Sequence, residues 1–338
     1  INDLYNSAQH KWIDPDTGQE RYEQSYDTNN GFDWTQGVNW STSPGAVDNS
    51  QTVRNLYYQA QLNWVRSFGK HNVTAMGLFS RQENARGSVM PTYREDWAFR
   101  TTYNYADRYF IEYNGAYNGS EKFSPENRFA FFNSGAIGWM ISEEPFMKFF
   151  REKKIVDMLK VRASYGEIGS DQLGPDPFDS SRRWLYMNQW AYGGHTTMDL
   201  NQTQSIYTWY RESAIGNKDI QWEVVKKLNV GIDYSFLEGL FAGSVEFFRD
   251  VRSNIFVYGG DRSIPSYFGG TPPSVNKGKI RTSGYELELR INKTFANDLR
   301  VWGNFSMTHA RNKVLVKDDQ ALRPGYQKAA GHAVNQYT

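Results

Sequence analysis

The sequence predicts an all-β fold, and more closely a transmembrane antiparallel β-barrel of which this chain forms part. Two observations predict it. Extended segments of about ten residues alternate between apolar and polar side chains, as strands do when their two faces meet different surroundings. The connections between these segments are short and long in turn, which is typical of outer-membrane barrels with short periplasmic turns and long extracellular loops.

The segment 158–166 shows the alternation most clearly. Leu159, Val161, Ala163 and Tyr165 share one face, and Lys160, Arg162, Ser164 and Gly166 share the other. A strand of about ten residues tilted by roughly 45° rises about 23 Å, close to the apolar band of about 25 Å in outer-membrane barrels. The spacing therefore predicts one face toward lipid and one toward a barrel interior.

The same alternation recurs along the chain. It predicts strands at 55–64, 72–80, 97–105, 109–117, 137–141, 158–166, 227–236, 241–247, 285–292 and 299–308. Turns at 67–71, 106–108, 237–239 and 296–298, and the longer connection 143–157, are expected on the periplasmic side. Loops at 81–94, 118–128, 168–220 and 252–277 are expected outside the cell. With up to two further strands before residue 50, we expect about 10–12 strands.

The composition excludes several other classes. The 338 residues carry a formal net charge of +1, and 16% are aromatic. That balance gives no support for binding to nucleic acid. Cysteine is absent, so no disulfide framework or thiolate metal site is expected. No apolar run of about 18 residues predicts a transmembrane helix. The chain opens without Met or a signal peptide, so we expect it to belong to a longer protein.

Two short motifs predict local structure outside the strands. Asp14-Pro15-Asp16-Thr17-Gly18 has turn composition, and its D-x-D-x-G spacing could also hold calcium. Without a bidentate Glu farther on, the turn is the favoured interpretation. Ser142-Glu143-Glu144-Pro145 predicts a Ser cap and a short helix over about 145–153. A weak strand is expected within 31–41.

A soluble β-sandwich also alternates, but its strands average about five or six residues and its connections need not alternate in length. Aromatic residues at the predicted strand ends favour a membrane girdle. They are Tyr103, Tyr105, Tyr109, Tyr234, Phe236 and Phe241. An open sheet edge is not viable in lipid, so we expect this chain to form one arc of a larger barrel.

Four blocks resemble the SusC/RagA-like TonB-dependent transporters of Bacteroidetes outer membranes. The blocks are Gly138 to Met147, Leu159 to Gly169, Trp222 to Asp233 and Asn276 to Leu287. The resemblance implies that residues 1–338 are a segment of a barrel of about twenty-two strands, within the range of known barrels. It also implies that the plug domain, the contact with TonB through that plug, and the C-terminal strands lie elsewhere in the protein.

The resemblance further implies active import of a bulky nutrient. The expected cargo is an oligosaccharide, or in some members a peptide, taken up with a SusD-like surface lipoprotein that acts as a lid. A barrel used for adhesion or secretion is one alternative, and a soluble all-β glycan-binding module is another. We expect no enzyme, because the five histidines are scattered and no catalytic motif is present.

Two sets of residues are candidates for binding. The loop 168–220 is rich in aromatic residues, which could stack on sugar rings, contact the lid, or pack the loop against itself. Its members are Trp184, Tyr186, Trp190, Tyr192, Tyr207, Trp209 and Tyr210. Polar residues on the inward face could line the path or contact the plug, the latter being favoured. They are Lys160, Arg162, Glu286, Glu288 and Arg290.

Overall fold

The computed structural model describes residues 11–13, 15–18, 20–22, 52–87, 90–174, 182–197, 204–296, 298–320 and 322–336. The chain divides into two units, Ile1–Gln51 and Thr52–Thr338. In the first, β1 (Lys11–Ile13) pairs with β2 (Glu20–Tyr22) in an antiparallel hairpin. Residues 15–17 form the predicted turn between them. The strand expected within 31–41 lies outside the described residues.

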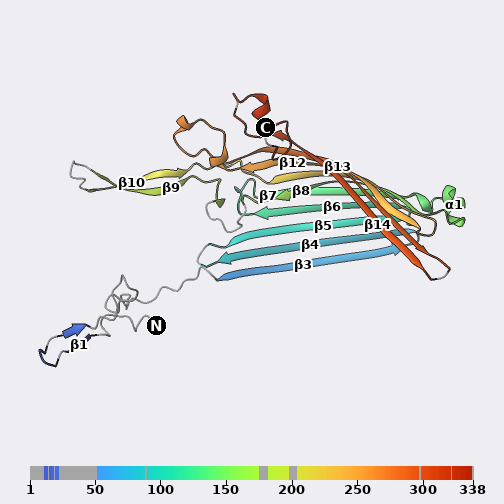
Figure 1. Ribbon diagram of the computed structural model, residues 1–338, viewed down its shortest axis with the longest axis horizontal. Coiled ribbons are helices and arrows are strands. Elements are labelled where there is room, and N and C mark those ends of the chain that lie inside the picture. Colours follow the sequence, from blue (N-terminus) through green and yellow to red (C-terminus); the bar gives the residue numbers. More distant parts are fainter. Residues whose placement is uncertain are drawn as a thin grey trace. The chain divides into compact units, whose positions relative to one another are not determined.

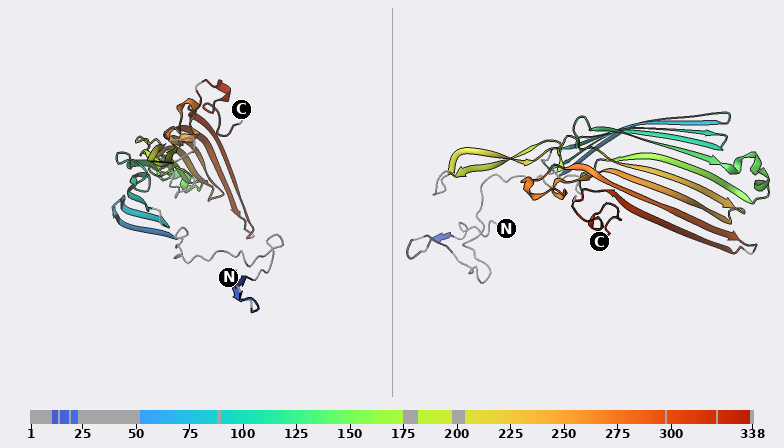
Figure 2. Two further views of the ribbon diagram at one scale, coloured as in Figure 1. Left: turned by 90° about the vertical axis from the view of Figure 1, so that its left-hand side faces the viewer. Right: turned by 90° about the horizontal axis from the view of Figure 1, so that it is seen from above.

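The second unit is built on one antiparallel sheet of ten strands (Figure 1). Its order is β14-β13-β12-β11-β8-β7-β6-β5-β4-β3. The strands are β3 (Val53–Phe68), β4 (His71–Arg86), β5 (Thr92–Tyr105), β6 (Tyr109–Ser120), β7 (Phe129–Met140), β8 (Val156–Ser170), β11 (Glu223–Phe236), β12 (Phe241–Val257), β13 (Val275–Thr294) and β14 (Arg300–Val316). Viewed end-on, the sheet is an open arc with β3 and β14 at its edges (Figure 2). The predicted partial barrel is confirmed.

The strands are longer than predicted. They run from 12 residues in β6 and β7 to 20 in β13, where about ten were expected for a membrane crossing. The predicted bounds of the loop 81–94 were therefore wrong. Strand β4 continues to Arg86 and β5 begins at Thr92, which leaves a shorter connection. Beyond the apolar band both faces of the strands are polar. The alternation of apolar and polar side chains therefore stops there, although the backbone hydrogen bonds between strands continue.

One end of the sheet carries the tight connections. Residues 69–70, 106–108, 237–240 and 295–299 join neighbouring strands there. Ala106 and Asp107 both have left-handed φ values, 51° and 56°, and the Asn104 side chain accepts a hydrogen bond from the Asp107 amide. Two consecutive left-handed residues match the right-handed twist of the strands they join. The opposite end carries the longer connections 121–128, 171–222 and 258–274.

The connection 141–155 also lies at the tight-turn end and is helical. It contains η5 (Ile141–Glu143), η6 (Pro145–Met147) and α1 (Lys148–Glu152), so the predicted helix is confirmed in outline. The predicted Ser cap was wrong: Ser142 is buried inside η5, and η6 has no side-chain cap. No helix among the described residues is long and apolar enough to cross a membrane.

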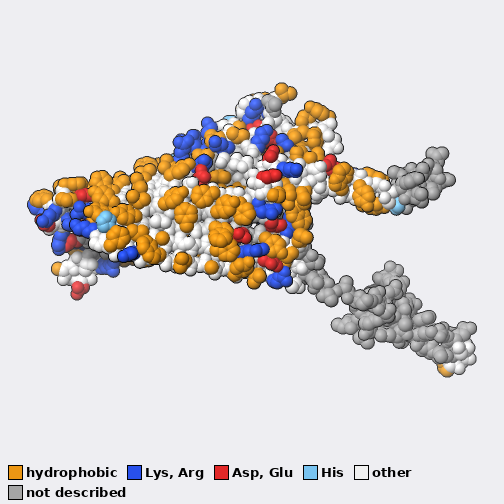
Figure 3. Space-filling model, turned by 180° about the vertical axis from the view of Figure 1, so that it is seen from behind, with side chains coloured by type: hydrophobic (Ala, Val, Ile, Leu, Met, Phe, Trp, Pro, Cys, Tyr) orange, Lys and Arg blue, Asp and Glu red, His pale blue; other side chains and the backbone are white. Residues whose placement is uncertain are grey.

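The apolar side chains of the sheet face outward, away from the concave side. Val230, Ile232 and Phe247 are at least 40% exposed although they lie well inside long strands, and Ile137 on β7 is 63% exposed. Figure 3 shows hydrophobic side chains spread along the sheet, with charged ones gathered toward its ends and upper edge. An apolar surface this continuous is far larger than soluble monomers expose. It is what a barrel presents to lipid.

Aromatic side chains gather at the tight-turn end of this outer face. The rings of Tyr105 and Tyr109 stack at 6.4 Å, and His71 contacts both Tyr103 and Tyr105. Tyr234 and Phe236 stack at 5.6 Å on β11. Such rings place an apolar body beside lipid and a polar tip near water.

Candidate functional site

The strand register places the predicted polar residues on one face of the sheet. Lys160 lies opposite Asp233, which lies opposite Ser244, which lies opposite Glu288. The next row contains Arg162, Gly231, Glu246 and Glu286. Residues directly opposite one another point to the same side of a sheet. Arg290 is two residues from Glu288, so Lys160, Arg162, Glu286, Glu288 and Arg290 all lie on the inner face.

Arg162 is the centre of an ion-pair network on this face. Its guanidinium pairs with Glu246 and, at 3.1 Å, with Asp233, and it donates to the Asn229 amide oxygen at 3.3 Å. Asn229 in turn donates to Glu246 at 3.0 Å. Sequence reasoning missed Glu246 and Asn229 as partners, because only the register shows which strands bring them to Arg162.

Gly231 leaves room for the Arg162 guanidinium in this network. It lies opposite Arg162, and a Cβ at this position would approach the guanidinium carbon to 3.1 Å. The space above Gly231 lets the guanidinium reach across β11 to Glu246 on β12. The whole group is one connected arrangement across three strands, with Arg162 neutralising two carboxylates.

The other predicted inner-face residues are less constrained. The Lys160 ammonium lies 4.9 Å from the centre of the Phe110 ring. Glu288 and Arg290 pair with each other along β13 at 2.8 Å and are well exposed. Glu286 is exposed beside the network. These groups leave charged and hydrogen-bonding atoms open on the concave side, as a water-filled or plugged interior permits.

A small core fixes the base of the loops at the long-loop end. Phe123, Phe132, Leu173, Leu185, Ile220 and Trp222 are all buried there. The Trp222 ring lies 5.2 Å from Phe123 and 5.6 Å from Phe132. Phe123 comes from the connection 121–128, Phe132 from β7 and the other four from the segment 171–222, so the core holds both ends of that segment together.

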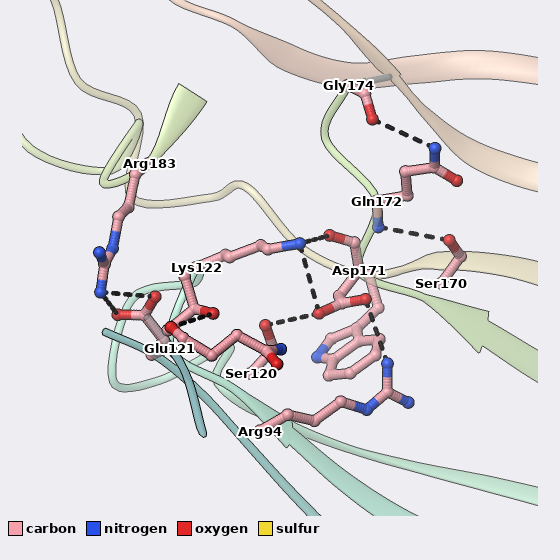
Figure 4. A network of polar contacts seen from close by, with 12 residues as sticks. Arg94, Ser120, Glu121, Lys122, Ser170, Asp171, Gln172, Gly174 and Arg183 are labelled. Atoms are coloured by element: carbon pink, nitrogen blue, oxygen red, sulfur yellow. Dashed lines mark hydrogen bonds and ion pairs between the residues drawn. The ribbon is translucent and has the colours of Figure 1, made fainter. Parts of the chain in front are cut away.

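Asp171 ties the same region together electrostatically (Figure 4). Its carboxylate accepts a hydrogen bond from Ser120 at 2.8 Å and pairs with Arg94 at 3.2 Å and Lys122 at 3.6 Å. Nearby, Arg183 is buried, pairs with Glu121 at 3.0 Å and donates to two backbone carbonyls. These contacts join the start of loop 171–222 to β5 and to the connection after β6.

The rest of that segment was predicted to be an irregular loop, and this was wrong, because it contains a separate hairpin. Strand β9 (Gln189–Thr197) pairs only with β10 (Gln204–Ala214), and the two stand apart from the ten-stranded sheet (Figure 1). The prediction missed them because the aromatic, Gly and Ser content hid the alternation, which register shifts interrupt in β10.

The hairpin presents four of the predicted aromatic residues. Trp190 and Tyr210 are each 64% exposed, and Tyr192 and Trp209 are also exposed. Tyr192 and Tyr210 lie opposite each other with ring centres 5.8 Å apart. Trp209 covers Gly193, where a Cβ would lie 2.4 Å from the indole ring. Aromatic surface is therefore available on both faces of the hairpin.

The remaining predicted aromatic residues of the loop behave differently. Trp184 and Tyr186 are half-buried at the base of the hairpin, and the Arg183 guanidinium lies 4.6 Å from the Trp184 ring centre. They belong to the packed base rather than to the projecting part. Tyr207 lies in β10, but its side chain falls outside the described residues.

A cavity of about 720 Å³ was not anticipated from the sequence. It lies between the long-loop ends of β12–β14 and the segment 317–336. Ile280 and Val314 give it an apolar floor, and Arg182, Asp261 and Arg323 bring charges to its lining.

Asp318, also in the lining, pairs with Lys277 and Arg262. Burial opposes the charged form of Asp318, but the two cations outweigh it and hold the pKa of this carboxyl below its usual value. A mixed apolar and charged lining of this kind suits a small polar ligand.

Among the described residues, no cluster of His, Asp and Glu could hold a metal ion. The calcium motif is not tested as a whole, since Asp14 lies outside the described part. His71 and His309 lie among aromatic rings on the outer face, beside Tyr103 and Tyr285.

Comparisons with known proteins agree with this architecture. Residues 2–335 match the family model described as TonB dependent receptor-like, beta-barrel. TonB-dependent receptor P3 of Formosa agariphila is 23% identical over 80% of this chain, which covers 28% of that protein. SusC of Bacteroides thetaiotaomicron is 25% identical over 73% of this chain and 27% of its own length.

A solved structure of the RagAB peptide transporter superposes with a TM-score of 0.62 at 17% identity, over 78% of this chain and 31% of that one. The chain thus spans less than a third of each of these three relatives. That family is one of outer-membrane receptors and transporters, with SusC among the relatives. Because the family model covers nearly the whole sequence, the chain belongs to the TonB-dependent receptor β-barrel family.

Proposed function

We propose that the full-length protein imports a bulky nutrient across the outer membrane in an active, TonB-dependent way. Its cargo would be an oligosaccharide, with a peptide as the second candidate. The sheet would form part of the barrel wall, and a plug carried elsewhere in the protein would make the contact with TonB. Membership of the receptor family supports this proposal, as does the similarity to SusC.

The observation that carries the proposal is the opposed character of the two faces of the sheet. Apolar side chains such as Val230 and Phe247 are exposed outward, while the Arg162 network occupies the concave side. In a closed barrel the first face meets lipid and the second meets water, plug or cargo. Adhesion or secretion barrels share this wall, so the proposal also needs a binding element.

The projecting hairpin β9–β10 is that element in the proposal. Flat aromatic faces bind the apolar faces of sugar rings, and Trp190, Tyr192, Trp209 and Tyr210 offer four of them on one short structure. Contact with a SusD-like surface lipoprotein would use the same surface. The hairpin base is held by Leu185 in the buried core, so a partner would meet a positioned structure.

The experiment compares the double variant Trp190→Ala/Tyr210→Ala with the wild type in the full-length protein. Tyr267→Ala is the matched control, since Tyr267 is 89% exposed in the different loop 258–274. We expect the double variant to lose about tenfold in cargo affinity or lid retention, given about 0.5–1.5 kcal/mol for each stacked ring that is removed. Two readouts separate the roles: glycan binding by the purified protein, and recovery of the lipoprotein on affinity purification.

Unchanged values for both readouts would remove the hairpin from the proposal. Deletion of the whole gene tests import itself, since growth on the cargo glycan should then fail. Growth that continues would favour the adhesion or secretion alternative.

A peptide cargo is favoured by one specific feature, the cavity lined by Arg182, Asp261 and Arg323. Charges of both signs suit the termini and side chains of a peptide better than a neutral glycan. Arg323→Ala should then weaken peptide binding and leave glycan binding unchanged. The opposite result would assign the cavity to the glycan.

A further inference from the structure

The outer face of β11–β14 changes from apolar to basic partway toward the long-loop end. The register defines successive rows across the four strands. In order toward the loops, three rows are Val230-Phe247-Tyr285-His309, Leu228-Arg249-Ser283-Arg311 and Lys226-Val251-Arg281-Lys313. The first row continues the lipid-facing surface. The next two carry five cations on the same face.

Four of these five cations have no partner among the described residues. Lys226 pairs with Glu167 of β8 at 2.8 Å. Arg249, Arg281, Arg311 and Lys313 make no side-chain hydrogen bond or ion pair with any residue of the described ranges. Arg249 and Arg281 lie on strands with neighbours on both sides, so the edge of the sheet does not account for their lack of partners.

The position of Arg249 along its strand is unusual for an outward-facing cation. The rise from Phe241, at the start of β12, to Arg249 is about 19 Å for a strand tilted by roughly 45°. On β4, the rise from His71 to Arg81 is about 23 Å on the same basis. Arg81 also has a partner, since its guanidinium lies 5.8 Å from the Tyr93 ring centre.

Arg249 therefore lies below the top of an apolar band of about 25 Å. On the same basis Arg311 lies about 26 Å above Arg300, and Lys313 and Arg281 lie about 30 Å above the tight-turn ends of their strands, so the cations span the upper boundary of the band. A cation at this boundary needs an anion, and within the described residues Glu167 is the one carboxylate that pairs with any of the five, through Lys226. Lipid headgroups lie at this height, and their phosphates are the anions that the long guanidinium side chains can reach.

We propose that Arg249, Arg281, Arg311 and Lys313 form a binding site for the phosphate groups of anionic lipid in the outer leaflet. Guanidinium groups bind phosphate with two parallel hydrogen bonds, which favours arginine over lysine at such sites. The apolar row with Phe247 and Tyr285 lies directly below and receives the acyl chains. A second copy of the chain is disfavoured here, because two basic faces repel each other. The inference does not depend on the cargo.

The test uses the full-length protein in lipid nanodiscs of phosphatidylcholine, with and without about a tenth of a bisphosphorylated glycolipid. Retained glycolipid is measured by native mass spectrometry, and Tm is measured in parallel. The variant is Arg249→Gln/Arg281→Gln. The control is Lys293→Gln, which removes an exposed outward cation from the tight-turn end of the same strand, β13.

We expect the glycolipid to raise the Tm of the wild type and the control, and the double variant to retain about tenfold less of it. The second double variant, Arg311→Gln/Lys313→Gln, should also retain less glycolipid. It keeps the test valid if the first variant fails to fold into the nanodisc. Equal retention by wild type, both double variants and control would overturn the proposal. An equal rise in Tm with free inorganic phosphate would also overturn it, because the site would then be a general anion site and not a lipid site.

Discussion

The ten-stranded sheet and the hairpin β9–β10 are built from similar residues under different constraints. In the sheet, each strand has neighbours and two contrasting faces, so a shift by one residue would expose every charge to the wrong surroundings. In the hairpin, aromatic residues are exposed on both faces and three register shifts are tolerated. The two surroundings of the sheet therefore fix the register of its strands, whereas the sequence of the hairpin is constrained less by register and can serve binding.

The largest effect is expected from a charge placed on the outer face. Ile232→Arg puts a cation on β11 near the middle of the apolar band, which should cost about 2–4 kcal/mol in membrane folding free energy. Thr308→Arg is the control, since it lies on the inner face opposite Glu286. Urea titration of folding into vesicles measures both. Equal costs would remove the distinction between the two faces.

A smaller effect is expected from breaking the inner network. Arg162→Met leaves Glu246 and Asp233 without their cation, and we expect a loss of about 1–2 kcal/mol because these side chains are partly exposed. The double variant Arg162→Met/Glu246→Gln should recover part of it, measured by the same titration. Additive losses would show that the two residues do not act together.

The connection at the tight-turn end should respond to pH. Hydrogen bonds from Tyr109 and Trp139, and then the charge of Arg108, hold the pKa of Glu144 below its ordinary value. A lowered folded pKa stabilises the fold above the unfolded pKa of about 4.3 and loses that effect as pH falls through the folded value. The Tm difference between wild type and Glu144→Gln should therefore shrink below about pH 4. A constant difference from pH 7 to pH 3 would contradict this role.

The smallest effect is expected in the hairpin. Tyr192→Ala removes an exposed ring whose ring contacts among the described residues, with Tyr210 and His195, lie within the hairpin, so the folding free energy should change by less than about 0.5 kcal/mol. Ala191→Gly, on the same strand, is a control for the backbone. A loss comparable with that of Arg162→Met would show that the hairpin is part of the wall after all.

The wall could be predicted from the sequence because lipid imposes a simple rule on it. Leu159, Val161 and Ala163 alternate with Lys160 and Arg162, and that pattern alone places them on opposite faces. Strand ends were predicted less well, since β4 and β5 continue through Arg81 and Arg94, where both faces are polar.

The contacts between strands could not be predicted in the same way. Arg162 meets Glu246 because β8 and β12 both pair with β11. The segment 171–222 separates β8 from β11 in the sequence, so their pairing could not be read from neighbouring residues. The basic rows on the outer face could not be predicted from the sequence for the same reason. Arg249, Arg281 and Arg311 are far apart in sequence, and only the register brings them together.

The absence of cysteine from the 338 residues allows the most direct test of the central assignment of the two faces. Single cysteines placed in turn at positions 228 to 233 of β11 can be labelled in lipid vesicles with one lipid-soluble and one water-soluble reagent. The assignment predicts that even positions, including Val230 and Ile232, react with the lipid-soluble reagent and odd positions with the water-soluble one. Labelling without alternation, or with the opposite parity, would contradict it.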